Sequence, residues 1–263
     1  MQLAGGMSLT PAQWMEIGFN LTYLVVIYGF VAAMSARLAT AADPLGVLHR
    51  LRAAFFLLAV GDTGHVGFRV IALLRGGLES RVELGGFSIG LVGAGALATA
   101  VTVTVFYLLL LEVWRLRFGA RTLGWSLLQA VGALRLVLLL APQNDWGSVV
   151  PPFEWSLVRN APLLVLGLGV AGLFLRDAGR AGARGAPGDA RTFTWFAVLI
   201  FASYAFYAPV ILFVQRAPWV GMLMVPKTVM YLLLAWLAWT RLFKAAPGGA
   251  DASLPGPHLP LKT

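Results

Sequence analysis

The sequence predicts an all-α integral membrane protein, a bundle of seven transmembrane helices with its N-terminus outside and its C-terminus in the cytoplasm. Composition is the first observation behind this prediction: 59% of the 263 residues are hydrophobic and 12% are charged, whereas soluble domains are roughly 25% charged. The second is the recurrence of apolar runs of about 20 residues, the length that crosses a bilayer core. The third is the concentration of basic residues in alternate loops, which sets the orientation.

Each predicted span is a long apolar run bounded by polar, proline or glycine residues. The spans are predicted at residues 14–36, 52–74, 88–114, 122–141, 156–176, 192–214 and 218–241. Pro11, Pro151 and Pro218 stand at or just before the starts of the first, fifth and seventh spans, positions where proline favours a helix start. We therefore predict one seven-helix transmembrane domain over residues 1–245, followed by a flexible cytoplasmic tail over residues 246–263 that is rich in proline and glycine.

Lysine and arginine predict the orientation, because loops that carry them resist translocation across the membrane. On one side, the loops and helix ends carry Arg37, Arg50, Arg52, Arg115, Arg117, Arg121, Arg176, Arg180, Arg184, Arg191, Arg241, Lys244 and Lys262. The other side carries Arg75, Arg81, Arg159 and Arg216. The richer side is therefore cytoplasmic, and we expect a multi-pass protein of the cell membrane.

Several functional classes are excluded or disfavoured. The net charge of +9 follows mostly from membrane orientation, so it does not indicate a nucleic-acid partner. The absence of cysteine excludes disulfides, a cysteine nucleophile and thiolate metal ligands. The three histidines fall in a loop, a span and the tail, so we expect no metal site and no cofactor. The expected partners are the lipid bilayer and an anionic small molecule or lipid, with a cytoplasmic protein or a second copy of the chain as further options.

Three titratable residues in the second predicted span indicate a functional site within the membrane. Ionisable groups in a bilayer are costly and usually face the interior of a bundle. Asp62, His65 and Arg69 fall within an arc of roughly 60° on one helix face. At about 1.5 Å rise per residue, Asp62 lies near the midplane and Arg69 about 10 Å further out. The stripe runs from mid-membrane to the outer surface.

The seventh predicted span carries Lys227 directly after Pro226. Proline removes a backbone donor and favours a kink or a local opening of the helix beside the lysine. We expect Lys227 to pair with Asp62, because an unpaired charge inside the membrane is unfavourable.

Four more residues complete the predicted ligand-binding set. Glu16 lies in the outer half of the first span and Arg135 in the outer half of the fourth. Tyr204 and Tyr207, in the sixth span, would form walls of the pocket. Cations outnumber acids in the whole set, which suits a carboxylate or a phosphate because arginine binds either one in a bidentate manner.

The leading hypothesis is therefore a protein that binds an anionic small molecule or lipid headgroup in an outward-facing polar pocket, as a receptor-like sensor or a transporter. An alternative is an intramembrane lipid-modifying enzyme, in which Asp62 and His65 act as general acid and base. A third is a structural membrane subunit whose polar groups serve helix association alone.

The layout of seven spans, with the N-terminus outside and Lys227 midway along the last, resembles that of rhodopsins. The resemblance implies a retinal bound to Lys227 as a Schiff base, with Asp62 as a counterion. The chain departs from the microbial rhodopsin pattern at Leu223, where an acid one turn before the lysine would be expected. The third span likewise carries threonines where that family has an acid.

Two other features have structural interpretations. Arg159, at the start of the fifth predicted span, is expected to anchor the helix end to lipid headgroups. Gly86, Gly90, Gly93 and Gly95 are expected to permit close helix packing around the start of the third span.

Overall fold

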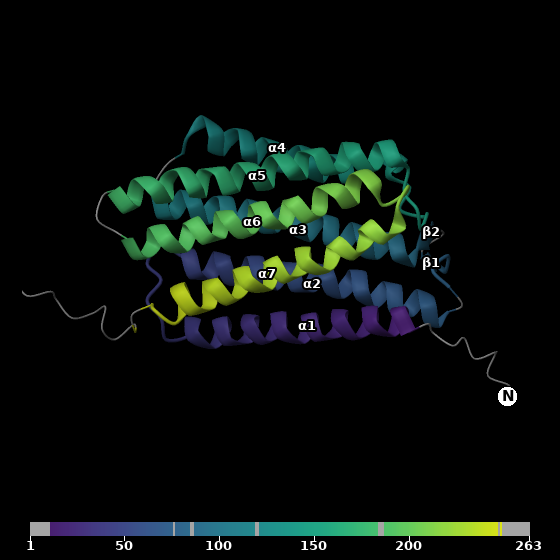
Figure 1. Cartoon of the computed structure of the whole chain (residues 1–263), viewed down its shortest axis with the longest axis horizontal. Coiled ribbons are helices and arrows are strands. Elements are labelled where there is room, and N and C mark those ends of the chain that lie inside the picture. Colours follow the sequence, from purple (N-terminus) through teal and green to yellow (C-terminus); the bar gives the residue numbers. More distant parts are fainter. Residues whose placement is uncertain are drawn as a thin grey trace, which may run out of the picture.

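The computed structural model describes residues 11–75, 77–84, 87–118, 121–183, 187–246 and 248. Within them the chain forms an up-and-down bundle of helices that lie along its long axis (Figure 1). The α-helices are α1 (Pro11–Leu38), α2 (Val47–Leu74), α3 (Leu91–Phe118), α4 (Leu123–Leu139), α5 (Phe153–Ala183), α6 (Pro187–Phe213) and α7 (Met224–Ala238). Each of them overlaps one predicted span. The predicted tail lies outside the described residues, apart from 246 and 248.

Length and apolar composition make this a helical bundle of the multi-pass membrane type. Six helices are long and apolar enough to cross a membrane, and α4, with 17 residues, is a shorter apolar helix. At about 1.5 Å per residue α4 measures roughly 26 Å, close to the thickness of a hydrocarbon core of about 30 Å. A 3-10 helix, η2 (Pro218–Leu223), precedes α7, and a π-helix, η3 (Trp239–Phe243), extends it.

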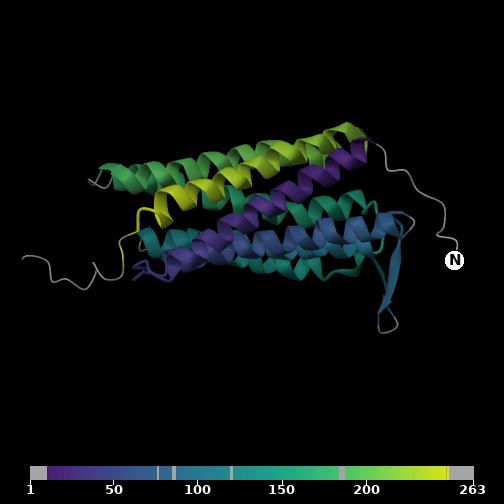
Figure 2. The same ribbon diagram turned by 90° about the horizontal axis from the view of Figure 1, so that it is seen from below.

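Helices that follow one another in the chain run in opposite directions, so their connections gather at two ends of the bundle. We call the end with residues 75, 77–84, 87–90, 140–152 and 214–223 the hairpin end, and the end with residues 39–46 and 244–246 the basic end. α1 begins at the hairpin end and crosses the neighbouring helices obliquely (Figure 2). Arg37, Arg50, Arg117, Arg180, Arg241 and Lys244 lie at or near helix termini at the basic end.

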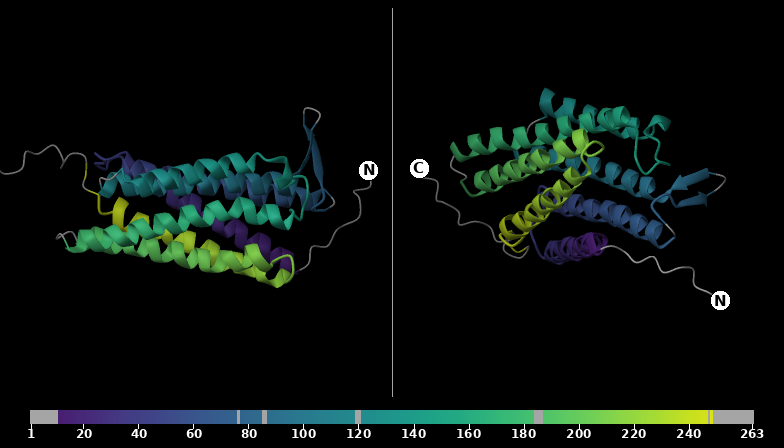
Figure 3. Two further views of the ribbon diagram at one scale, coloured as in Figure 1. Left: turned by 90° about the horizontal axis from the view of Figure 1, so that it is seen from above. Right: turned by 45° about the vertical axis from the view of Figure 1, so that its right-hand side comes forward.

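A short β-hairpin departs from the all-α prediction. Strand β1 (Arg81–Leu84) pairs antiparallel with β2 (Phe87–Gly90), and the hairpin projects beyond the helices (Figure 3). The third helix consequently begins at Leu91, so the prediction that it starts at residue 88 was wrong. The physical reason is visible in the sequence: alternating apolar residues flank two consecutive glycines at positions 85 and 86, a pattern typical of a two-residue hairpin turn.

Close packing of α2 against α3 depends on glycine. A Cβ atom at Gly95 would lie 2.9 Å from the Cα atom of His65, which confirms the predicted role of Gly95 in helix packing. Gly93 and Gly90 instead make room for the backbone of residues 146 and 147 in the loop after α4. Gly86 lies outside the described residues.

The half of the bundle toward the basic end is filled by packed aromatic side chains. Phe174 stacks on Phe193 with ring centroids 5.1 Å apart, and Phe196 packs against both rings. Buried Trp114 donates a hydrogen bond from Nε1 to Oδ2 of Asp177 over 3.1 Å, which ties α3 to α5. Polar groups that could accept a ligand within the bundle therefore lie in the other half.

Candidate functional site

A cavity of about 1080 Å³ occupies the half of the bundle toward the hairpin end. It is lined by α1, α2, α3, α5, α6 and α7, by η2, and by Arg135 from α4. Seven of the eight predicted ligand-binding residues line it: Asp62, His65, Arg69, Arg135, Tyr204, Tyr207 and Lys227. The side chain of the eighth, Glu16, lies outside the described residues. The fold thus brings together polar residues that are distant in the sequence, from α2 to α7.

An aromatic floor closes the cavity toward the basic end. Tyr204 and Tyr231 line the cavity, and buried Tyr107 lies against both of them. The hydroxyls of Tyr107 and Tyr231 share a hydrogen bond of 3.0 Å, and Tyr204 donates one of 2.8 Å to the carbonyl of Leu163. Phe106 adds an edge-to-face contact to Tyr231. Since the hydroxyls of all three tyrosines take part in hydrogen bonds within the protein, we expect the floor to be rigid.

Asp62 supplies the carboxylate of the cavity. Tyr23 of α1 donates a hydrogen bond to its Oδ2 over 2.6 Å, which joins α1 to α2 at the level where Asp62 was predicted to lie. The other carboxylate oxygen makes no hydrogen bond to the part of the chain that the structure describes. The sequence places Tyr23 on one face of the first span with Glu16 and Asn20, but Tyr23 was not included in the predicted ligand-binding set.

Lys227 does not form the expected direct pair with Asp62. Its ammonium lies over the ring faces of Tyr207 and Tyr231, 4.8 and 5.3 Å from their centroids. Among the described residues it has no hydrogen-bond partner and no carboxylate in direct contact. The cation–π contacts, worth about 2 kcal/mol or more when desolvated, take the place of a direct contact, while Lys227 and Asp62 still attract each other electrostatically. Three N–H donors therefore remain available to a ligand in the cavity.

Arg135 is both a cavity residue and a tie between helices. Its side chain is 2% exposed, and Nε donates a hydrogen bond of 3.1 Å to the carbonyl of Arg159 on α5. One terminal nitrogen donates to the carbonyl of Ala100 over 2.6 Å and to the hydroxyl of Thr104, both on α3. The guanidinium is thus held by neutral acceptors and keeps its positive charge beside the cavity.

Arg159 is a cavity residue, and the interpretation of it as a headgroup anchor was wrong. The side chain is buried and its guanidinium lies 4.4 Å from the ring centroid of Trp146, while both residues line the cavity. The cause is the loop after α4, which folds over the start of α5 and covers Arg159. The neighbouring Asn160 accepts a hydrogen bond of 3.1 Å from Tyr207.

His65 and Arg69 extend the polar lining along α2, as their spacing predicted. The imidazole of His65 makes no hydrogen bond to any described residue. Neither ring nitrogen is completely buried. No group of three histidine, cysteine, aspartate or glutamate side chains that could hold a metal ion occurs in the described ranges.

The balance of charge in the cavity favours an anionic ligand. Its described lining includes one carboxylate, Asp62, and four side chains that are basic in water: Arg69, Arg135, Arg159 and Lys227. Burial in a low-dielectric bundle strengthens the field of these cations. Arginine and lysine together match the oxygens of a phosphate or a carboxylate.

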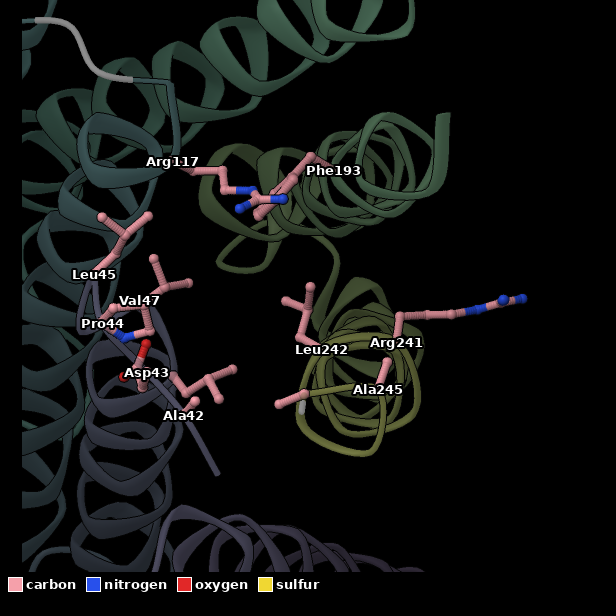
Figure 4. A pocket seen from close by; sticks show the side chains of 12 residues that line it. Ala42, Asp43, Pro44, Leu45, Val47, Arg117, Phe193, Arg241, Leu242 and Ala245 are labelled. Atoms are coloured by element: carbon pink, nitrogen blue, oxygen red, sulfur yellow. The ribbon is translucent and has the colours of Figure 1, made fainter. Parts of the chain in front are cut away.

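A second, smaller cavity of about 260 Å³ lies at the basic end (Figure 4). The loop at Asp43 forms one side and residues 241–246 the other, while Arg241 points away from the space. His49 donates to the Asp43 carboxylate from its backbone N–H over 3.0 Å, and its Nδ1 lies 2.7 Å from the same oxygen. Burial raises the pKa of Asp43, but these hydrogen bonds outweigh it and hold the pKa below its ordinary value. The carboxylate in the lining of this cavity, Asp43, is thus already paired with His49.

Comparisons of the chain with protein-family models, with curated proteins and with solved structures found no match.

Proposed function

We propose that this seven-span bundle, with its N-terminus outside, binds an anionic small molecule or a lipid headgroup in the larger cavity, as a receptor-like sensor or a transporter. The observation that carries the proposal is the cavity itself, where four cations surround a space with one described carboxylate. Its volume of about 1080 Å³ lies at the upper end of the range for small-molecule sites, roughly 300–1,000 Å³. Lys227 and Arg69 would contact the ligand, and Arg135 and Arg159 would add charge from fixed positions.

The closed aromatic floor supports a cavity that is reached from the hairpin end. If that end is the outer one, as the distribution of basic residues predicts, a ligand would arrive from outside the cell. A transporter would then have to part the aromatic layer, whereas a sensor would need only a shift of α7. Pro226 lies in the first turn of α7, directly after η2, so a ligand bound at Lys227 would lie beside the junction of these two helices.

Substitution of Lys227 tests the proposal. Hydrogen bonds to charged groups contribute roughly 1.5–3 kcal/mol, so we expect Lys227→Gln to weaken binding of phosphate, butyl phosphate, acetate or butanoate about tenfold or more. The measurement is the ligand-dependent rise in thermal stability of the purified full chain in neutral detergent. The matched control is Lys244→Gln, because Lys244 also lies over an aromatic ring, Trp239, but at the basic end. Wild-type protein that none of these anions stabilises would contradict the proposal.

A second candidate function is modification of a membrane lipid by acid–base chemistry. It is favoured by the cavity position of Asp62 and His65, whose carboxylate and imidazole retain atoms without a partner among the described residues. Prolonged incubation of the purified protein with a panel of phospholipids, followed by mass spectrometry, separates the two functions. A product that depends on Asp62 would indicate an enzyme. If the phospholipids stay unchanged, binding without catalysis is the function that remains.

A further inference from the structure

Exposed residues in its described lining indicate where the larger cavity reaches the surface of the bundle. Of the residues that line it, four are also exposed: Met15, Pro218, Met222 and Val225. They come from only two segments, the first turns of α1 and the stretch formed by η2 and the start of α7. The other lining residues are buried or half-buried. The opening therefore lies between these two segments.

The rim of this opening has the composition of a membrane interface. Met15 and Met222 are each 67% exposed and Val225 is 43% exposed. Two exposed tryptophans, Trp14 and Trp219, adjoin the rim, and tryptophan is enriched where the hydrocarbon meets the headgroups. An opening with methionine, valine and proline at its edge and tryptophan beside it faces lipid more naturally than bulk water.

The lining changes from apolar to polar with depth on the three helices nearest the opening. On α1, Met15 and Ile17 lie toward the opening, and Asn20 and Tyr23 lie deeper. At about 1.5 Å per residue, Met15 and Tyr23 are separated by roughly 12 Å along the helix axis.

The same order occurs on α6 and α7. Val210 on α6 and Val214 just after it lie nearer the opening than Tyr207, and Val225 lies nearer the opening than Lys227 on α7. The apolar passage from the rim to the polar groups is thus about 10 Å long beside α6 and about 3 Å long beside α7.

We infer that the ligand is an amphiphile, with a phosphate or carboxylate headgroup and an acyl or alkyl chain, that enters sideways from the membrane. The inference rests on the proposed function and adds the chain and the route. The anionic headgroup binds at Lys227, and the chain lies in the apolar passage with its end between α1 and η2. A short water-soluble anion would leave that passage filled only by water, which is unfavourable for an apolar surface.

Chain length and a blocked rim test this inference. The full chain is purified in neutral detergent and titrated with phosphate, butyl phosphate and octyl phosphate, with butanoate and octanoate as the carboxylate series and octyl glucoside as the uncharged control. A methylene transferred from water contributes roughly fourfold in affinity, and the micelle competes for the chain. We therefore expect octyl phosphate to bind at least about tenfold more tightly than butyl phosphate, or octanoate at least about tenfold more tightly than butanoate. Octyl glucoside should bind weakly.

Val225→Trp is expected to reduce the preference for the octyl ligand over its four-carbon partner to about twofold or less, because the larger side chain fills the space for the ligand chain. The matched control is Val198→Trp, since Val198 on α6 is 42% exposed, like Val225 at 43%, but does not line the cavity. Equal affinities across a chain-length series would overturn the inference and leave the proposed function standing. Octyl glucoside binding as tightly as octyl phosphate, without effect of Lys227→Gln, would overturn the proposed function. If Val225→Trp does not fold, the chain-length titration of the wild-type protein still tests the inference.

Discussion

The hydrogen bond from Tyr23 to Asp62 is the residue-scale contact on which the position of the cavity carboxylate depends. We expect Tyr23→Phe to lower the free energy of unfolding by about 1–2 kcal/mol, because a hydrogen bond to a carboxylate is lost inside the bundle. Tyr28→Phe is the matched control. The hydroxyl of Tyr28 on α1 also shares a hydrogen bond with α2, to the hydroxyl of Thr63 over 3.0 Å, but this bond is exposed. Its loss should cost about 0.5 kcal/mol or less. Reversible unfolding in mixed micelles measures both, and equal losses would contradict the ranking.

Charged residues of the site were predictable at this scale, but their partners were not. The cost of burying a charge in a membrane pointed to Asp62, His65 and Lys227, and all three line one cavity. The sequence does not encode how that cost is lowered: the ammonium of Lys227 lies over two aromatic rings and not in direct contact with a carboxylate. Arg159 was misinterpreted because its position at a helix start carries no sign that residues 140–152 fold back over it.

At the scale of elements, the contact of α2 with α3 positions the polar stripe of α2. We expect Gly95→Ala to destabilise the bundle by about 1–3 kcal/mol, because the new methyl group would press against the backbone of α2 at His65 and force the helices apart. It should also weaken anion binding, since His65 lines the cavity. Gly67→Ala is the control: a Cβ at Gly67 meets nothing within 4 Å. That substitution should be neutral or stabilising by up to about 1 kcal/mol. Similar destabilisation by both would refute the packing argument.

Helices were more predictable than their ends and connections. Apolar runs of spanning length fix where a helix must be, because backbone polar groups in a bilayer have to be satisfied within the helix. Its ends depend on local chemistry. α5 continues through Arg176 and Arg180, seven residues past the predicted limit, because both arginines pair with Asp177 on the same helix.

For the whole molecule, the orientation in the membrane decides from which side a ligand reaches the cavity. The basic end carries most of the lysine and arginine near helix termini, and the cavity lies in the opposite half. Since basic loops stay in the cytoplasm, the opening between α1 and η2 should lie in the outer leaflet. The chain contains no cysteine, so single cysteines can be introduced without a background of native thiols.

We therefore expect a membrane-impermeant maleimide to label intact cells that carry Glu83→Cys or Gln143→Cys, both exposed at the hairpin end. Leu45→Cys and Lys244→Cys, exposed at the basic end, should react only after the cells are permeabilised. The opposite pattern would place the opening in the inner leaflet. The larger cavity would then have to draw its proposed ligand from the cytoplasmic side, where the surface charge of anionic lipids is greatest, and amphiphile capture would be tested with lipids of that leaflet.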